Sequence, residues 1–274
     1  MTATFVVVPQ WQGSGSSRAM RLIDGVEAIS GDLPTSSTLT VEVPPGAGSS
    51  LGSAVHRLSS IQYVRDELRA TLQDASSPPI TIGGDCGVEL AAIEHAIAGG
   101  DTLVVWIDAH ADLNTPATSP SGAFHGMVLR TLLGDGPPEL VPATPLRPDR
   151  VILAGARALD DAESEFVEAS GIRMIGPESL TPSSLREAMD ASGARSVYLH
   201  VDLDVLDPAE FECVSYPEPF GISVQALLAL IAEAKSALPL AGAGLMEFAP
   251  ASAESAADDM PTILRIVGAL ARRP

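Results

Sequence analysis

The chain has little cysteine, few aromatic residues and little positive charge. Its 274 residues include two cysteines, 4% aromatic residues, and 16 lysines and arginines against 35 aspartates and glutamates, for a formal net charge of -19. Two cysteines cannot build a disulfide framework. The excess of negative charge disfavours binding to nucleic acid or to an anionic membrane surface. A small cationic molecule is the partner that this charge favours.

Long hydrophobic runs are also lacking. No stretch of about 18 apolar residues suggests a membrane helix, and the N-terminal MTATFVVVPQWQ has neither the basic start nor the longer apolar core of a signal peptide. We therefore expect a cytoplasmic protein with no membrane role, in which Cys86 and Cys213 are free thiols. We expect Cys213, which lies in a loop, to have no role in the functional site.

Short β-branched segments alternate with segments of helical pattern. Such alternation predicts a parallel sheet. No composition shift marks a domain boundary, so we predict an α/β fold of three αβα layers in a single domain over residues 1–274. The expected strands lie near residues 5, 38, 79, 103, 151, 173, 197 and 244, and the expected helices cover 51–72, 88–98, 161–170, 182–192, 223–238 and 258–273.

Acidic motifs follow three of the expected strands: GGDC at 83–86, DAHADLN at 108–114 and DLDVLDP at 202–208. In open α/β sheets the ligand crevice lies at the carboxyl ends of the strands, so we expect these motifs to meet there. Side chains two residues apart in an extended segment share a face. That spacing predicts one face for Asp108, His110 and Asp112, and another for Asp202 with Asp204.

Four carboxylates can be buried together only if cations neutralise them. One divalent ion would leave most of the charge unbalanced, so we expect two. Carboxylate oxygens with one or two nitrogen ligands suit Mn²⁺, and Fe²⁺, Co²⁺, Ni²⁺ and Zn²⁺ stay open. A pair of ions about 3.5–4 Å apart can hold a hydroxide at neutral pH, which indicates metal-assisted hydrolysis. The alternative is that these acids cap helices or line solvated loops.

The segments WIDAHADLNTPATSPSGAFHGM and HVDLDVLDPAEFECVSYPEP resemble the signatures of the arginase, or ureohydrolase, family. The resemblance extends from about residue 79 to residue 250. It implies an arginase-like αβα fold around an eight-stranded, mainly parallel sheet, and two metal ions bridged by Asp108 and Asp202. The other metal ligands that it implies are Cys86 and Asp112 for one ion, and His110 and Asp204 for the other.

The same resemblance implies roles around the metals. His125 would carry a proton to the leaving amine and Glu247 would pair with a guanidinium group; with Asp112 they form the implied catalytic set. The substrate would be a small guanidino amino acid. Its α-carboxylate and α-amino groups would be bound by Asn114 and Ser121, and by Asp160 and Glu163.

Three positions depart from the family pattern. Cys86 stands where the family has histidine, so a thiolate would replace a neutral imidazole and favour softer metal ions; a buried thiol that does not touch metal is the alternative. Ala123 and Tyr216 replace an asparagine and a threonine and change the pocket wall. His200 shares a strand face with the third motif, and we expect it to be a core histidine or to support a ligand.

Cysteine at this position is similar to members of the family that act on Nω-hydroxy-L-arginine in the biosynthesis of the antibiotic D-cycloserine. The resemblance therefore implies an amidinohydrolase that forms L-ornithine and hydroxyurea through attack of a metal-bridging hydroxide on the guanidino carbon. The alternatives are a conventional arginase and a metal-poor, non-catalytic relative. A phosphoesterase ranks last, because the motifs lack clustered basic residues. The oligomeric state stays open, and the lack of a long C-terminal extension allows a monomer.

Overall fold

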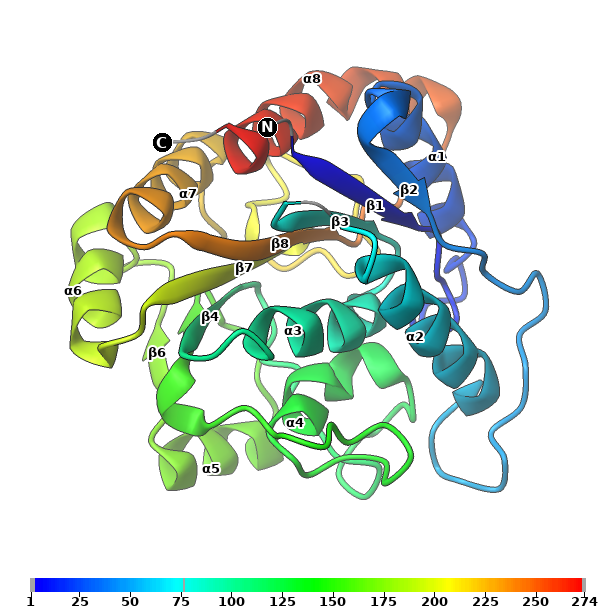
Figure 1. Ribbon diagram of the computed structural model, residues 1–274, viewed down its shortest axis with the longest axis horizontal. Coiled ribbons are helices and arrows are strands. Elements are labelled where there is room, and N and C mark those ends of the chain that lie inside the picture. The colour runs from blue at the N-terminus through cyan, green and yellow to red at the C-terminus, as the bar shows by residue number, and fades with distance from the viewer. Residues whose placement is uncertain (1–2, 76, 273–274) are drawn as a thin grey trace.

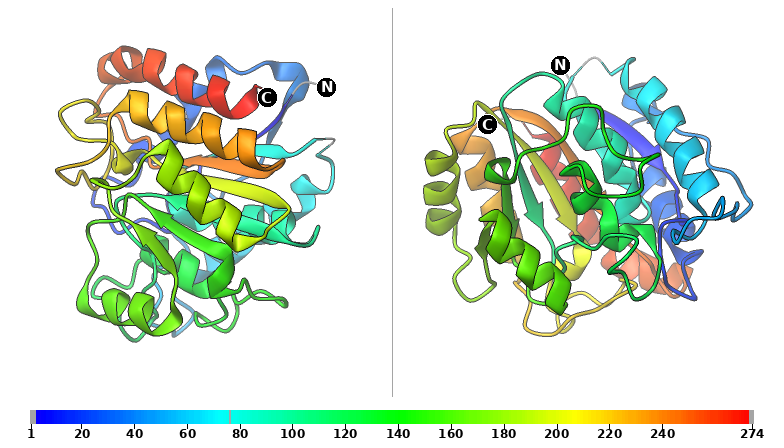
Figure 2. Two further views of the ribbon diagram at one scale, coloured as in Figure 1. Left: turned by 90° about the vertical axis from the view of Figure 1, so that its left-hand side faces the viewer. Right: turned by 90° about the horizontal axis from the view of Figure 1, so that it is seen from below.

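The computed structural model describes residues 3–75 and 77–272, and it places an eight-stranded sheet between two layers of helices (Figures 1 and 2). The predicted three-layer α/β architecture is therefore confirmed. Every expected strand segment forms a strand, and every pairing between these strands is parallel. The strands are β1 (Thr4–Val8), β2 (Thr38–Thr40), β3 (Pro79–Gly83), β4 (Thr102–Ile107), β5 (Val151–Ala154), β6 (Arg173–Ile175), β7 (Ser196–Asp202) and β8 (Leu240–Met246).

The order of strands across the sheet is β2-β1-β3-β8-β7-β4-β5-β6. Because successive side chains of a strand point to opposite faces, the sheet separates two hydrophobic clusters. In β1, for example, Phe5 and Val7 belong to one cluster, whereas Val6 and Val8 belong to the other. Both faces of the sheet are thus buried, as all-parallel sheets require.

Helices cover both faces of the sheet. The cluster on one face includes side chains of α1 (Arg21–Gly31), α6 (Pro182–Ser192), α7 (Val224–Ala237) and α8 (Ala253–Ala271). The other includes side chains of α2 (Leu58–Leu72), α3 (Glu89–Ile97), α4 (Val128–Leu132) and α5 (Asp161–Ser170). In Figure 1, α7 and α8 lie above the sheet, and α3 and α4 lie below it. None of the helices in the described part of the chain is long and apolar enough to cross a membrane.

Two helix predictions differ from the structure at their starts. The helix expected over 51–72 begins only at Leu58, because Leu51 and Arg57 have positive φ angles of 54° and 56° and cannot continue a right-handed helix. The last helix begins earlier than predicted, where Ser252 caps it. Its predicted end at residue 273 lies outside the described residues.

The sequence pattern did not predict α1 or α4. Helix α1 contains Gly25, which lowers helix propensity. The glycine is there because a Cβ atom would lie 2.0 Å from the backbone oxygen of Phe248, in the segment after β8. Close packing of α1 against that segment therefore requires a glycine that weakens the helical pattern of the sequence.

Candidate metal centre

Four neighbouring strands, β3, β8, β7 and β4, bring the acidic motifs to one edge of the sheet. Cys86 follows β3, Asp108 follows β4, Asp202 ends β7 and Glu247 follows β8. All four side chains are buried. The predicted convergence of the three motifs at the carboxyl ends of the strands is thus what the structure shows, with a fourth strand supplying Glu247.

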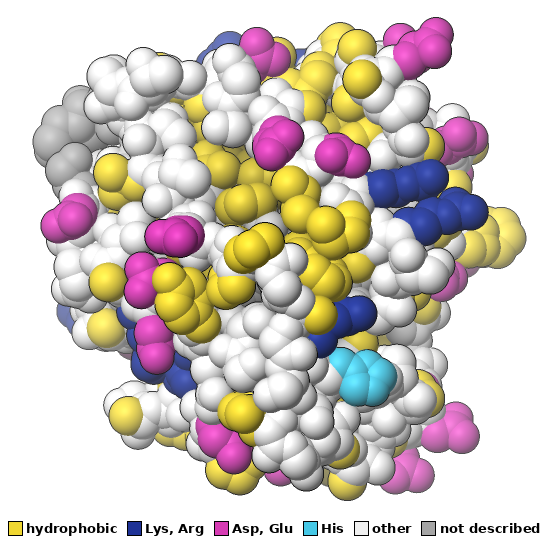
Figure 3. All heavy atoms as spheres, turned by 90° about the vertical axis from the view of Figure 1, so that its right-hand side faces the viewer, with side chains coloured by type: hydrophobic (Ala, Val, Ile, Leu, Met, Phe, Trp, Pro, Cys, Tyr) yellow, Lys and Arg dark blue, Asp and Glu magenta, His cyan; other side chains and the backbone are white. Residues whose placement is uncertain are grey.

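Figure 3 shows the side of the molecule that lies at the right of Figure 1, toward which the strands run. Hydrophobic side chains gather in the middle of this face, and both acidic and basic side chains lie around them. Five acids of the three motifs, in contrast, are buried beneath the surface: Asp85, Asp108, Asp112, Asp202 and Asp204. The negative charge of the site therefore comes from buried carboxylates more than from acidic side chains on the surrounding surface.

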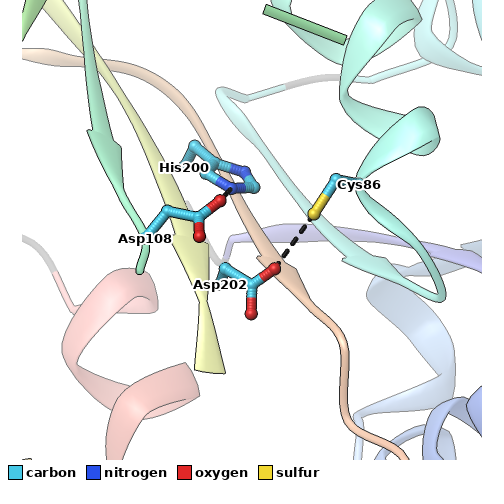
Figure 4. A group of neighbouring side chains, drawn as sticks. All are labelled: Cys86, Asp108, His200 and Asp202. Carbon is cyan, nitrogen blue, oxygen red and sulfur yellow. Dashed lines mark hydrogen bonds and ion pairs between the residues drawn. The ribbon is translucent and has the colours of Figure 1, made fainter. Parts of the chain in front are cut away.

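Cys86 lies on a short 3-10 turn, Cys86–Val88, that follows β3. Its sulfur is 3.0 Å from Oδ2 of Asp202 (Figure 4). The preceding Asp85 holds this turn in place, because its carboxylate accepts hydrogen bonds from the backbone of Gly87 at 2.8 Å, from Gln10 at 3.0 Å and from the backbone of Gly13 at 2.9 Å. The thiol therefore points toward Asp202, and the hydrogen bonds to Asp85 hold its turn in place.

His110 and Asp204 lie together beside Asp108. The Nδ1 atom of His110 is 2.9 Å from Oδ2 of Asp204 and 3.5 Å from Oδ1 of Asp108. Asp204 lies on the turn after β7, where its backbone N–H donates to Oδ1 of Asp202 at 2.8 Å. Backbone amides and one imidazole thus orient three carboxylates toward a common volume.

The prediction that strand alternation sets these side chains on shared faces was wrong. Strand β4 ends at Ile107, and Asp112 has a φ of 52°, so residues 108–112 do not form an extended segment with a shared face. Asp204 likewise lies on a 3-10 turn, Leu203–Val205, and not on a strand. Tight turns after the strands, stabilised by carboxylate-to-backbone hydrogen bonds, bring these side chains together instead.

Two groups of potential metal donors result. The first contains Cys86, Asp108, His200 and Asp202, and the second contains Asp108, His110 and Asp204; in each group the donor atoms lie within 4.8 Å of one another. Five of the six predicted ligands belong to these groups. The sixth, Asp112, lies in neither group, although its side chain is buried and its Oδ2 atom has no hydrogen-bond partner in the part of the chain that the structure describes.

The donor set fits a pair of divalent ions. Burial, and then the neighbouring acids, raise the pKa of Asp202 and of the Cys86 thiol well above their usual values. The same causes raise the pKa of Asp204 to about 6. Burial also opposes ionisation of Asp108, but hydrogen bonds from His110 and His200 hold its pKa below the ordinary range. Acids that are crowded in this way need protons or metal cations to neutralise their charge.

Glu247 and His125 face each other across the site. The Nδ1 atom of His125 is 3.8 Å from Oε1 of Glu247, whose two carboxylate oxygens are buried without hydrogen-bond partners among the described residues. Glu247 has a φ of 65°, a strained conformation for a residue with a side chain. Burial, and then the charge of His110, lower the pKa of His125 to about 4. A buried carboxylate without a partner is well suited to receive a cationic group.

Tyr216 forms one wall of this site. Its ring stacks on the His125 ring, with centroids 5.1 Å apart and planes 29° apart. A Cβ atom on Gly15 would lie 3.0 Å from the Tyr216 hydroxyl and 3.1 Å from Cβ of Ala123. Two of the three positions at which the chain departs from the family pattern, Tyr216 and Ala123, therefore lie at one wall, beside the imidazole.

Three of the four predicted substrate-binding residues lie together at the start of α5. Nδ2 of Asn114 donates to Oδ2 of Asp160 at 2.8 Å, and Asp160 is the N-cap of the helix. Glu163 closes the capping box and accepts a hydrogen bond from the backbone of Leu113 at 3.0 Å. Glu163 is therefore engaged by the backbone. Ser121 lies in an exposed turn, where its Oγ accepts from the backbone N–H of Ala123 at 3.2 Å.

His200 is more closely tied to the site than its sequence context indicated. It is fully buried, and its Nε2 atom lies 3.4 Å from Oδ2 of Asp108 (Figure 4). Its position two residues before Asp202 on a strand was the signal for this contact. Glu89, which faces the other side of the His200 ring, lies outside the three acidic motifs and was not predicted. Cys213 belongs to neither donor group, and its sulfur is 3.9 Å from the backbone oxygen of Ser255.

Comparison with known proteins gives consistent results. The profile of the arginase family matches residues 18–269. The chain is 35% identical to an arginase of Bacillus subtilis over 53% of its length, and it spans about half (52%) of that relative. It is 33% identical over 205 residues to the N(omega)-hydroxy-L-arginine amidinohydrolase of Streptomyces lavendulae, which is 71% of each chain.

Solved structures share the fold. The arginase of Entamoeba histolytica, crystallised with L-ornithine, superimposes with a TM-score of 0.86 at 24% identity over 98% of this chain and 97% of that one. The Bacillus subtilis arginase superimposes with a TM-score of 0.80 at 25% identity over 100% and 99% of the two chains.

Proposed function

The chain belongs to the arginase family, and we propose that it uses two divalent metal ions to hydrolyse the guanidino group of Nω-hydroxy-L-arginine, forming L-ornithine and hydroxyurea. The observation that carries this proposal is the Cys86 sulfur 3.0 Å from Asp202, within a buried group of donors. The Streptomyces lavendulae relative supports the choice of the hydroxylated substrate by its name and by its 71% coverage. A role in D-cycloserine biosynthesis and a cytoplasmic location stay predictions.

Cys86, Asp108, Asp112 and Asp202 would hold one ion, and Asp108, Asp202, His110 and Asp204 the other. When bound, such a pair lowers the pKa of water and so supplies a nucleophile at neutral pH. Mn²⁺ suits this oxygen-rich set, while the thiol shifts the preference of one site toward softer ions. The unpartnered oxygen of buried Asp112 supports its place in the set, because an orphan carboxylate in the interior is costly.

Around the ions, the buried carboxylate of Glu247 receives the guanidino group of the substrate. The ordinary partner of a guanidinium is a carboxylate, and both oxygens of Glu247 are free of hydrogen bonds within the described residues. His125, 3.8 Å from Glu247, is neutral at pH 7 with its pKa near 4, so it can accept a proton and pass it to the departing nitrogen.

The amino-acid end of the substrate lies toward Asn114, Ser121, Asp160 and Glu163. Asp160 is the member best able to bind an ammonium group, because its side chain is partly exposed, whereas Glu163 is buried. Tyr216 and Ala123 form the adjoining wall, where the family has a threonine and an asparagine. A wall changed at both positions supports a substrate that differs from arginine.

The thiol also has a chemical rationale. A thiolate adds negative charge to one metal and makes it a weaker electrophile than a histidine ligand would. The hydroxyl group of Nω-hydroxy-L-arginine withdraws electrons and lowers the basicity of the guanidine, so a weaker electrophile suffices. Conventional arginase activity is the second candidate, supported by the 35% identity to the Bacillus subtilis arginase.

One product assay tests the proposal. The purified protein, supplied with Mn²⁺, is incubated with L-arginine and with Nω-hydroxy-L-arginine in parallel, and ornithine, urea and hydroxyurea are quantified together with metal content. We expect two ions per chain and a kcat/KM at least tenfold higher for the hydroxylated substrate. A preference for arginine would favour the second candidate. Fewer than two ions without any product would point to a non-catalytic relative.

A further inference from the structure

Glu89, the first residue of α3, is a buried acid outside the metal ligands. Its side chain is fully buried, and neither carboxylate oxygen has a hydrogen-bond partner among the described residues. It lies over Gly244 of β8, where a Cβ atom would be 1.5 Å from its Oε1. Glycine at 244 therefore leaves room for this carboxylate. A buried, unpaired carboxylate costs free energy and calls for a compensating contact.

His200 provides that contact. Its Nδ1 atom lies 3.6 Å from Oε1 of Glu89, and its Nε2 atom lies 3.4 Å from Oδ2 of Asp108. The two ring nitrogens therefore join an acid outside the metal centre to a carboxylate within it. In the sheet, His200 is the register partner of Gly244 on β8 and of Trp106 on β4. Gly244, His200 and Trp106 therefore form one row across three neighbouring strands.

Trp106 fixes both the imidazole and the carboxylate. Its indole ring stacks on the His200 ring, with centroids 3.6 Å apart and planes 20° apart, and its Nε1–H donates to Oδ2 of Asp108 at 2.9 Å. The Oδ1 atom of Asp108 accepts from the backbone N–H of His110 at 2.6 Å. Both oxygens of Asp108 are thus oriented by hydrogen bonds from the chain itself.

We infer that Glu89 and His200 are positioning residues, which hold Asp108 in the orientation that binds the metal pair. The inference rests on the proposed function, because it takes Asp108 to be a ligand of both ions. Outer partners of this kind contribute about 10–100-fold to metal affinity in other metalloproteins. In this chain the partner is the imidazole of His200, which contacts the carboxylate of Asp108 and belongs to the same donor group as Cys86 (Figure 4).

Cobalt titration of the metal-free protein tests the inference without relying on activity. His200→Phe keeps an aromatic ring against Trp106 and removes both ring nitrogens. We expect about 10–100-fold weaker binding of at least one Co²⁺ ion. At saturation, the visible cobalt bands and the thiolate-to-cobalt absorption should match those of wild type, since the ligands are unchanged. Glu89→Gln should weaken binding in the same direction but by a smaller factor, because the amide oxygen can still accept from the imidazole.

Tyr198→Phe is the matched control. Tyr198 lies on the same strand as His200, and its buried hydroxyl is beside Glu89, whereas Asp108 is not among the groups that act on it. We expect this variant to bind Co²⁺ as wild type does. Circular dichroism and thermal unfolding of each metal-free variant report its fold, and Glu89→Gln carries the test if His200→Phe does not fold.

Three outcomes would overturn the inference. The first is wild-type affinity in both His200→Phe and Glu89→Gln. The second is a change of the visible cobalt bands of His200→Phe at saturation, which would make His200 a ligand itself. The third is wild-type protein that binds fewer than two Co²⁺ ions, which would also overturn the proposed function. The first two leave the proposed function intact.

Discussion

The sulfur of Cys86 lies 3.0 Å from Oδ2 of Asp202, although β3 and β7 are separated in the sheet by β8. The thiol donates a hydrogen bond to a carboxylate that the family resemblance assigns to both metals. Burial and the nearby acids raise the pKa of this thiol well above its usual value, so without metal it is protonated at neutral pH. Metal binding through sulfur must displace that proton.

Replacement of Cys86 by histidine tests the link between the thiol and the substrate. The neutral imidazole removes one negative charge from the centre and makes the metal a stronger electrophile. We expect Cys86→His to raise the kcat/KM for L-arginine relative to that for Nω-hydroxy-L-arginine by about tenfold or more, equivalent to about 1.4 kcal/mol. Cys213→Ser, at the thiol outside both donor groups, should keep the wild-type ratio. An unchanged ratio in Cys86→His would remove the electronic explanation.

Proton release tests the contact of Cys86 with metal. Calorimetric titrations with Cd²⁺, a thiophilic ion, in buffers of different ionisation enthalpy give the number of protons released per chain. We expect Cys86→Ala to release about one proton fewer than wild type at pH 7. Equal proton release by the two proteins would place the thiol outside the metal coordination.

His125→Asn should impair catalysis while leaving metal content unchanged. His125 is in neither donor group, and its ring lies 3.8 Å from Glu247 and against Tyr216. Loss of a general acid or base costs about 10²–10⁴-fold in rate. We expect a fall in kcat of this order with two ions still bound per chain. A kcat within twofold of wild type would exclude the role of proton carrier.

Wild type and His125→Asn should also differ in how the free energy of unfolding of the metal-free protein depends on pH. Burial lowers the folded-state pKa of His125 to about 4, below the usual value of about 6.5. Between these values the unfolded chain binds more protons at this residue, so its contribution to the free energy of unfolding rises with pH. Wild type should therefore gain stability relative to His125→Asn from pH 4 to pH 7, on the order of 3 kcal/mol. A difference that stays flat or falls in urea denaturation would contradict the burial argument.

Asp160→Ala separates capping from substrate binding. Asp160 caps α5 and accepts a hydrogen bond from Asn114 at 2.8 Å. We expect a loss of about 1 kcal/mol in the free energy of unfolding, together with a higher KM for the amino acid. Thr181→Ala removes the equivalent cap of α6 and serves as the control, with a similar loss of stability and an unchanged KM. Equal KM values in the two variants would leave Asp160 only a capping role.

The sequence was sufficient to predict the sheet and the convergence of the three acidic motifs at one edge of it. Alternation of β-branched and helical segments is a local property, and all eight expected segments form strands. The motifs around Cys86, Asp108 and Asp202 could be expected to meet, because parallel strands point their carboxyl ends toward one edge of the sheet.

Only the tertiary structure decided which strands are neighbours and how the turns after them are shaped. The order β3-β8-β7-β4 places Glu247 beside the two donor groups. Asp112 has a left-handed backbone conformation in place of the strand alternation that the sequence suggested, and Glu247 has a left-handed conformation as well. The contact from Glu89 through His200 to Asp108 joins three segments with no shared motif. Periodicity reports which face of its own element a residue occupies, whereas such contacts depend on packing between elements that are distant in the sequence.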